Sequence, residues 1–263
     1  MGRFAAIVVL LGVALYVSVV MTQPSRASGP DGAAGPTKAV IVELFTSEGC
    51  SSCPSADALL GHLRQDLAAR NIEVIPLGFH VDYWDFQGWK DRFSSSNFTQ
   101  RQQQYARQMR LEGPYTPQMV VDGTIEFVGS NASQAEQAIS KSAGGPALAD
   151  VTLSAKSADQ LNIEVKGSSP ANGARVMLAI TEDNLSTQVR GGENGGHELH
   201  HAAVVRELRQ LGTTKDGAFS RDVPLKPKKE WKPGDLHAVV FVQDGDAGKV
   251  LGAASVPWPN QQR

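Results

Sequence analysis

Cys50 and Cys53 are the residues whose types and spacing most directly indicate chemistry. They are the only two cysteines in the chain, and cysteines three positions apart can form and break a disulfide reversibly. Closing so short a loop removes little conformational entropy from the unfolded chain, which disfavours a purely structural bridge. A structural zinc site needs four ligands, so two cysteines alone do not complete one. The pair therefore predicts redox chemistry.

The residues on either side of this pair predict a strand, a sharp turn and a helix. Residues 41–45 are largely apolar and branched or aromatic, as in a buried strand, and Gly49 supplies the turn. Apolar residues then recur every three or four positions as far as Leu67. This pattern places both cysteines at the N-terminus of a helix, where free backbone N–H groups and the helix dipole stabilise a thiolate.

The order of the two cysteines predicts their roles. Cys50 comes first, at the exposed tip of the helix, so we expect it to attack a substrate disulfide. Cys53 lies one turn further in, and we expect it to resolve the mixed disulfide. Ser51 and Ser52 lie between them, and we expect their hydroxyls to hydrogen-bond to the Cys50 thiolate, lower its pKa and contact the substrate.

An aromatic segment follows the next predicted strand. Residues 72–79 predict a buried strand parallel to the first, and the active site of such a strand–helix–strand unit lies beyond the strand ends. Four aromatic residues, Tyr83 and Trp84 among them, come immediately afterwards. One interpretation is that they pack beneath the helix predicted at 90–111. The other is that they form a wall of a substrate groove, with Tyr83 and Trp84 in contact with the substrate.

Two further signals complete the first half of the chain. Thr116-Pro117 opens a short apolar strand, and Asp122-Gly123 joins that strand to another in a hairpin. Ser133 and Glu136 form a capping box for a third helix. The predicted order of elements across residues 38–143 is therefore β-α-β-α-β-β-α.

That order, with Cys-x-x-Cys at the first helix and Thr116-Pro117 at the third strand, resembles the thioredoxin fold. Residues 43–54, 79–85 and 115–118 are also similar to a secreted bacterial family known as domain of unknown function 1223. That family is described as thioredoxin-like, and its physiological substrate is unsettled. We therefore expect a thioredoxin-like α/β domain over residues 38–145.

The resemblance implies roles for three more residues. It places a cis peptide bond before Pro117, which would face the disulfide, and it offers the backbone of Thr116 to an extended substrate. Glu43 would match a buried carboxylate that relays a proton to Cys53, although it lies one position further from Cys50 than the usual spacing. A solvent-exposed strand edge is the alternative for Glu43. Ser-Ser between the cysteines, in place of the usual Gly-Pro, leaves the direction of electron flow open.

The second half of the chain has a different pattern. Residues 149–156 and 160–166 alternate apolar and polar side chains around a short turn, and further strand-like segments follow without any strand–helix–strand order. We expect residues 146–259 to form an antiparallel β-sandwich, which the family resemblance also implies. The expected fold class is therefore an α/β thioredoxin-like domain followed by an antiparallel β-sandwich domain.

One motif in this half resembles a metal site. Residues 197–201 satisfy the His-Glu-x-x-His pattern of zinc peptidases, which requires both histidines on one face of a helix. The glycine-rich residues 191–196 lead into it, the surrounding pattern is rich in strands, and no third ligand is evident. We predict no metal site here.

The first residues have the pattern of a targeting segment. Arg3 precedes an apolar run, residues 4–21, and small residues follow it at 25–28. We expect residues 1–28 to be a signal peptide and residues 29–37 a flexible lead-in, so that the protein is periplasmic or secreted. An uncleaved anchor is the alternative, and membrane contact is expected only in that case. The formal charge of −2 argues against a nucleic-acid partner.

The cysteine pair and the targeting segment together predict an exported thiol–disulfide oxidoreductase that needs no cofactor. Its partners would be a protein thiol or disulfide substrate and a second redox protein. Two other functions stay open. One is a chaperone for copper or another metal that uses Cys50, Cys53 and His80, since soft thiolates suit Cu(I). The other is a non-catalytic interaction module in which the disulfide is structural.

Overall fold

The computed structural model describes residues 38–157 and 159–258, so the predicted signal peptide and lead-in lie outside the described residues. The helices are α1 (Pro54–Ala68), α2 (Ser96–Met109) and α3 (Ala132–Ala143), with a 3-10 turn at Pro233–Asp235. The strands are β1 (Val40–Thr46), β2 (Val74–His80), β3 (Gln118–Val121), β4 (Ile125–Val128), β5 (Asp150–Ser157), β6 (Gln160–Lys166), β7 (Arg175–Glu182), β8 (Leu185–Gln188), β9 (Glu198–His201), β10 (Val204–Thr213), β11 (Phe219–Pro224), β12 (Leu236–Gln243) and β13 (Val250–Pro257). None of these helices is long and apolar enough to cross a membrane.

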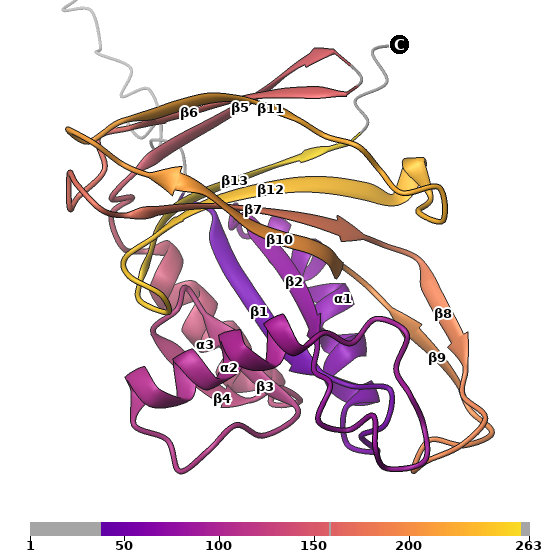
Figure 1. The fold of residues 1–263 in the computed structure, drawn as a ribbon. Coiled ribbons are helices and arrows are strands. Elements are labelled where there is room, and N and C mark those ends of the chain that lie inside the picture. The colour runs from indigo at the N-terminus through magenta and orange to yellow at the C-terminus, as the bar shows by residue number, and fades with distance from the viewer. Residues whose placement is uncertain (1–37, 158, 259–263) are drawn as a thin grey trace, which may run out of the picture. The chain divides into compact units, whose positions relative to one another are not determined.

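An eight-stranded mixed sheet holds the two halves of the chain together (Figure 1). Its strand order is β13-β12-β7-β10-β2-β1-β3-β4. β1 runs parallel to β2 and antiparallel to β3. On its other side β2 meets β10 through the parallel pair of Gly78 and Val204, and the backbone N–H of Gly78 donates to the carbonyl of Ala203 at 2.8 Å.

The expected fold class is wrong, although the first seven elements follow the predicted order β-α-β-α-β-β-α. The chain does not form an α/β thioredoxin-like domain followed by a separate antiparallel β-sandwich. Four strands of the second half, β7, β10, β12 and β13, continue the sheet of the first half. The others form two small sheets, one of β5, β6 and β11 and one of β8 and β9. The physical reason is that the edge of β2 carries unpaired backbone groups, which β10 partly satisfies.

One face of the large sheet is covered by α2. Ser95 caps this helix by accepting from the backbone N–H of Asn97, and the buried positions 98, 101, 102, 105 and 106 form a single helical stripe. That stripe packs over side chains of β1, β2, β7 and β12, so its apolar core runs across both halves of the chain. The helix therefore stabilises the junction as well as the first half.

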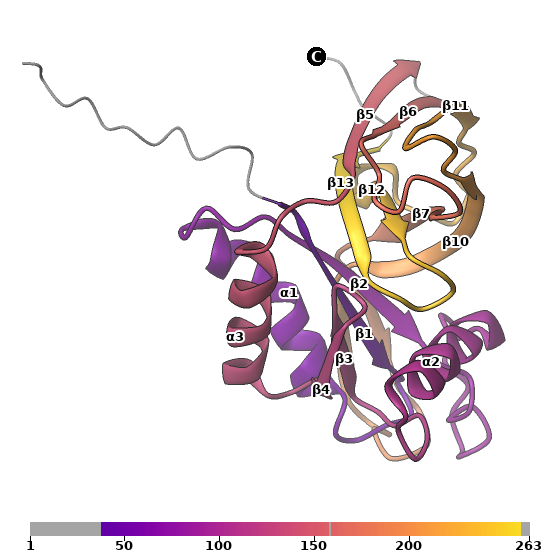
Figure 2. The same ribbon diagram turned by 90° about the vertical axis from the view of Figure 1, so that its left-hand side faces the viewer.

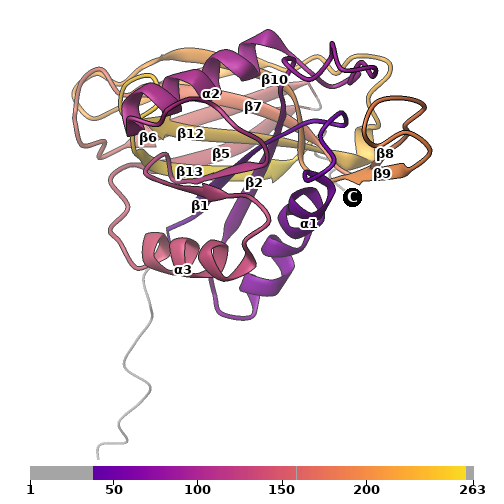
Figure 3. The same cartoon turned by 90° about the horizontal axis from the view of Figure 1, so that it is seen from below.

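The opposite face is covered in two parts. Helices α1 and α3 pack on β1 and β3, while the small sheet of β5, β6 and β11 packs on β7 and β12. Figures 2 and 3 show α1 and α3 on one side of the strands and α2 on the other. Since α1 and α2 lie on opposite faces, the direction of each side chain of β1 decides which helix it meets.

Candidate functional site

Cys50 and Cys53 form a disulfide in the turn between β1 and α1, with their Cα atoms 5.4 Å apart. Cys53 is the N-cap residue of α1, and Pro54 occupies its first turn, where a missing N–H leaves no hydrogen bond unmade. The backbone N–H of Cys53 donates to the carbonyl of Cys50 at 3.2 Å. The side chain of Cys53 makes no capping hydrogen bond to the N–H groups of the first turn. Because the disulfide lies at this end of α1, the positive end of the helix dipole is next to its sulfurs.

The two serines between the cysteines play different parts. The hydroxyl of Ser52 lies 3.4 Å from the sulfur of Cys50, as expected. Ser51 instead offers its backbone N–H to the carboxylate of Glu193, at 2.9 Å. Both serine residues are exposed.

The disulfide itself is covered, which differs from the expected exposure of Cys50. Cys50 is 1% exposed and Cys53 is 0% exposed. Trp84 contributes to the cover: a Cβ at Gly49 would lie 3.2 Å from the Cβ of Trp84, so glycine allows the two loops to approach closely. A sulfur in this position is open to another protein only after part of the cover has moved.

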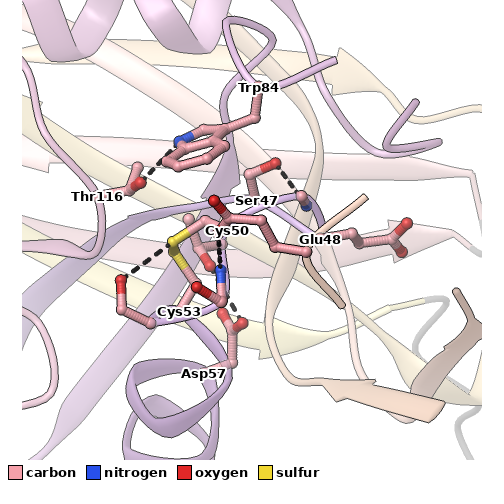
Figure 4. The surroundings of a disulfide bond; sticks show 12 residues. Ser47, Glu48, Cys50, Cys53, Asp57, Trp84 and Thr116 are labelled. Atoms are coloured by element: carbon pink, nitrogen blue, oxygen red, sulfur yellow. Dashed lines mark hydrogen bonds between the residues drawn. A yellow bond between two sulfur atoms is a disulfide. The ribbon is translucent and has the colours of Figure 1, made fainter. Parts of the chain in front are cut away.

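The contacts of Tyr83 and Trp84 bear on both interpretations of the aromatic segment, packing beneath a helix or forming a wall of a substrate groove. The indole N–H of Trp84 donates to the hydroxyl of Thr116 at 2.8 Å, beside the disulfide (Figure 4). Tyr83 points instead to α2, where its hydroxyl donates to Gln102 at 3.3 Å. Burial raises the pKa of Tyr83 to about 12, so its hydroxyl stays protonated at neutral pH. Both rings also pack against the apolar core beneath α2, and the Tyr83 hydroxyl interacts with Thr116, so the segment lies under the helix and beside the disulfide at once.

The predicted cis peptide bond between Thr116 and Pro117 is confirmed. The carbonyl of Pro117 accepts from the backbone N–H of Gly129 at 2.9 Å. A Cβ at position 129 would lie 3.2 Å from Pro117 and 3.3 Å from Ala56 in α1, so this segment packs closely on the first turn of the cysteine helix. Thr116 is half-buried, and its hydroxyl is engaged by Trp84.

Glu43 lies away from the cysteines. It is fully buried, so a solvent-exposed position is excluded, but its side chain is on the face of β1 that packs against α2. Arg101 holds both carboxylate oxygens, with Nε to Oε2 at 2.5 Å and Nη2 to Oε1 at 2.8 Å. The hydroxyl of Tyr105 donates to Oε1 at 2.5 Å. These contacts give Glu43 a structural role, because α1 and its cysteines lie on the other face of the sheet.

Several buried polar residues lie near the disulfide, and the sequence had pointed to His80 among them, as a candidate metal ligand, but not to Asp57 or Asp91. Asp57 follows Cys53 by one helical turn and accepts from the hydroxyl of Thr46 at 3.1 Å. Burial raises the pKa of Asp57. His80 and Asp91 lie 2.6 Å apart, and although burial alone would lower the pKa of His80, the Asp91 carboxylate holds it above its ordinary value. His80 is the last residue of β2, and a polar residue at the end of a buried strand was the signal available in the sequence.

Glu48 and His201 complete this buried group. The indole of Trp89 donates to one oxygen of Glu48 at 2.7 Å, and the other oxygen lies 3.4 Å from Nε2 of His201. The His201 and His80 rings are 4.9 Å apart. Across the described part of the chain, no group of three or more His, Cys, Asp or Glu residues is arranged to hold a metal ion.

The glycine-rich loop between β8 and β9 reaches the cysteine turn. The side-chain amide of Asn194 donates to the carbonyls of Glu48 and Cys50, at 2.9 and 3.0 Å. The His-Glu-x-x-His pattern that follows lies on the strand β9, where Glu198 is exposed and His201 is buried. The pattern therefore has no helical face on which both of its histidines meet.

The sequence model of one protein family, described as protein of unknown function (DUF1223), matches residues 41–243 of this chain. The chain belongs to this family. The part that matches DUF1223 begins in β1 and ends with β12, so it includes both the cysteine turn and the loop that carries Glu193 and Asn194. The predicted membership of DUF1223 is thereby confirmed, and the match carries no statement about a thioredoxin fold or about secretion.

Two solved structures are similar to this DUF1223 protein. The crystal structure of a protein from Agrobacterium tumefaciens is 26% identical with a TM-score of 0.68, and the match covers 85% of this chain and 96% of that one. HBP35 of Porphyromonas gingivalis is 18% identical with a TM-score of 0.59, and covers 85% of this chain and 76% of that one. At 18% identity the likeness concerns the fold alone. No curated protein matches the chain.

Proposed function

We propose that this protein is a thiol–disulfide oxidoreductase that acts through Cys50 and Cys53. The observation that carries the proposal is the position of their disulfide at the N-terminus of α1, beyond the carboxyl ends of the parallel strands β1 and β2. That end of a helix favours the thiolate that exchange requires. Trp84 and Thr116 lie beside the disulfide and are the residues to which we assign contact with substrate.

In a single turnover the proposed reaction uses only the cysteine disulfide and a substrate dithiol, and a second redox protein then reoxidises Cys50 and Cys53 by the same exchange. A substrate thiolate attacks the sulfur of Cys50, a bond forms between these two sulfurs, and Cys53 leaves as a thiolate. A second substrate thiolate then attacks the mixed disulfide and releases Cys50. Two electrons pass from the substrate to the cysteine pair, and the two protons lost by the substrate thiols are available to Cys50 and Cys53. The reverse sequence reduces a substrate disulfide.

A second candidate function, an inert structural disulfide in an interaction module, is favoured by one observation. Both cysteines are buried, and a covered disulfide resists attack. The two candidates differ in the reduction potential of the pair. Structural disulfides have potentials below about −300 mV, whereas those of exchange catalysts lie at higher values, roughly −120 to −270 mV.

The deciding experiment combines that potential with trapping. Oxidised protein is equilibrated with glutathione or dithiothreitol buffers, and the reduced fraction is measured by alkylation and mass spectrometry. Cys53→Ser should then hold a substrate protein on Cys50 as a mixed disulfide, while Cys50→Ser, the matched control, should hold none. A potential in the structural range together with no trapped partner would exclude the oxidoreductase.

We also propose that the protein acts outside the cytoplasm, because disulfides persist there and the N-terminal apolar segment has the pattern of an export signal. Fractionation of the source cells and mass spectrometry of the mature chain test this. An export signal that is removed gives a mature protein starting near residue 29. A full-length chain in the cytoplasmic fraction contradicts the proposal.

A further inference from the structure

The cysteine turn is held by a segment of the second half of the chain, the loop 189–197 between β8 and β9. Figure 1 shows this hairpin extending from β7 and β10 toward the loops that follow β1 and β2. Its two ends are joined by backbone hydrogen bonds, with the N–H of Val189 donating to the carbonyl of His197 at 2.9 Å. Gly191 approaches Gly88 so closely that a Cβ on Gly191 would lie 2.5 Å from the Gly88 carbonyl oxygen. The loop is therefore seated against its neighbours.

Two side chains of this loop bind the backbone on both sides of Cys50. Asn194 is buried and donates to the carbonyl of Cys50 itself and to that of Glu48, two residues earlier. Glu193 is exposed and accepts from the backbone N–H of Ser51, the residue after Cys50. Together they make hydrogen bonds to the backbone of three of the four residues from Glu48 to Ser51.

We propose that Glu193 and Asn194 are positioning residues of the redox pair: Asn194 holds the cysteine turn closed over the disulfide, and Glu193 disfavours the Cys50 thiolate. Both effects stabilise the disulfide relative to the dithiol and slow its reduction. This inference rests on the proposed function, and it gives the second half of the chain a part in setting the redox behaviour of the first.

The charge argument for Glu193 follows from where it binds. Hydrogen bonds from the Ser51 side chain and backbone lower the pKa of Glu193, so its carboxylate is charged at neutral pH. A fixed negative charge at the helix N-terminus opposes a second one on the neighbouring sulfur. Four more titratable groups contact the cysteine turn or lie in the first turn of α1: Glu48, Asp57, Asp91 and His201. All four are buried, and all four are present in every variant at position 193.

The first test isolates the charge. Wild type, Glu193→Gln and Glu193→Asp are reduced, and the rate of alkylation of Cys50 is measured against pH. The matched control is Glu198→Gln, which removes an exposed carboxylate from the same hairpin. We expect Glu193→Gln to lower the pH midpoint of alkylation and, at pH 9 in a glutathione buffer, to raise the dithiol-to-disulfide ratio about three- to fivefold, the size of one solvent-screened charge interaction. Glu193→Asp should restore most of the wild-type behaviour.

The second test measures access. Asn194→Ala should raise the rate at which dithiothreitol reduces the disulfide several-fold, because the turn loses both hydrogen bonds from the Asn194 side-chain amide. Circular dichroism checks that the variant is folded.

The outcomes separate the inference from the proposed function. Equal midpoints for Glu193→Gln and wild type, or equal shifts in Glu193→Gln and Glu198→Gln, would overturn the role of Glu193. An unchanged reduction rate in folded Asn194→Ala would overturn the role of Asn194. A wild-type pair that reaches no equilibrium with glutathione contradicts the oxidoreductase function, and the alkylation profile of the chemically reduced protein then still decides whether Glu193 controls the thiolate.

Discussion

Replacing Arg101 with methionine tests how α2 is joined to β1. The guanidinium of Arg101 makes two bonds to Glu43, and both groups are withdrawn from solvent, at 5% and 0% exposure. Methionine keeps an apolar stem of similar shape but removes the cation, and the Glu43 carboxylate then retains the hydroxyl of Tyr105 as its hydrogen-bond donor. Leaving a buried charge without its partner costs about 3–5 kcal/mol. That is a large share of the ~5–15 kcal/mol that stabilises an ordinary domain.

A double-mutant cycle gives the sharper form of this prediction. Arg101→Met, Glu43→Gln and the double variant are unfolded in urea at one pH, with tryptophan fluorescence as the signal. The double variant should lose less stability than the sum of the single variants, by roughly 1–3 kcal/mol, because it leaves no unpaired charge. A loss below ~1 kcal/mol for Arg101→Met, the range of an exposed ion pair, would refute the burial of this pair. If folded Glu43→Gln exchanges thiols and disulfides more slowly than wild type, Glu43 relays a proton to Cys53, as the sequence predicted.

Three further predictions concern the surroundings of the disulfide. Burial raises the pKa of Asp57 in the folded protein above its value in the unfolded chain. The contribution of Asp57 to the free energy of unfolding is therefore complete below pH ~3.9 and is lost as the pH rises through the pKa of the folded protein. Asp57→Asn should therefore unfold at higher urea than wild type at pH 7, and a less stable variant would contradict this. The Asp91 carboxylate raises the pKa of His80 in the folded protein, so the contribution of His80 to stability is complete below pH ~6.5 and is lost as the pH rises through that raised pKa. In urea titrations His80→Gln should therefore lose more stability, relative to wild type, at pH 6 than at pH 9. An equal loss at both pH values would contradict this. Gly191→Ala should push the 189–197 loop away from Gly88 and speed reduction by dithiothreitol, and a wild-type rate would show that the loop does not control access.

Local sequence patterns predicted the parts of the site that depend on near neighbours. The apolar run at 41–45, Gly49 and the three- and four-residue spacing of apolar side chains placed β1, the turn and α1 correctly, and with them the cysteine pair at the helix N-terminus. The same kind of pattern could not assign a direction to Glu43. A central strand is apolar on both faces, so a single acid within it gives no indication of which helix it meets.

Long-range pairing was beyond the reach of these patterns. A strand such as β7, which is buried at every position but its first, is recognisable as a core strand, but its sequence does not identify the neighbouring strand. The continuation of the first half's sheet through Gly78 and Val204 was therefore missed. Glu193 and Asn194 were missed for the same reason, since a glycine-rich segment predicts a loop without naming its partner. The buried Asp57 gave a weak signal only, because acidic residues are common in the first turn of any helix.

The cover of the disulfide also has a consequence for the order in which the protein is made. Glu193 follows Ser51 by 142 residues, a separation that takes roughly 7–30 s to synthesise at 5–20 residues per second. Throughout that interval the cysteines have emerged while the loop that closes over them does not yet exist. A bond introduced between the two sulfurs at this stage requires no movement of folded protein, whereas every later exchange has to open the finished structure first.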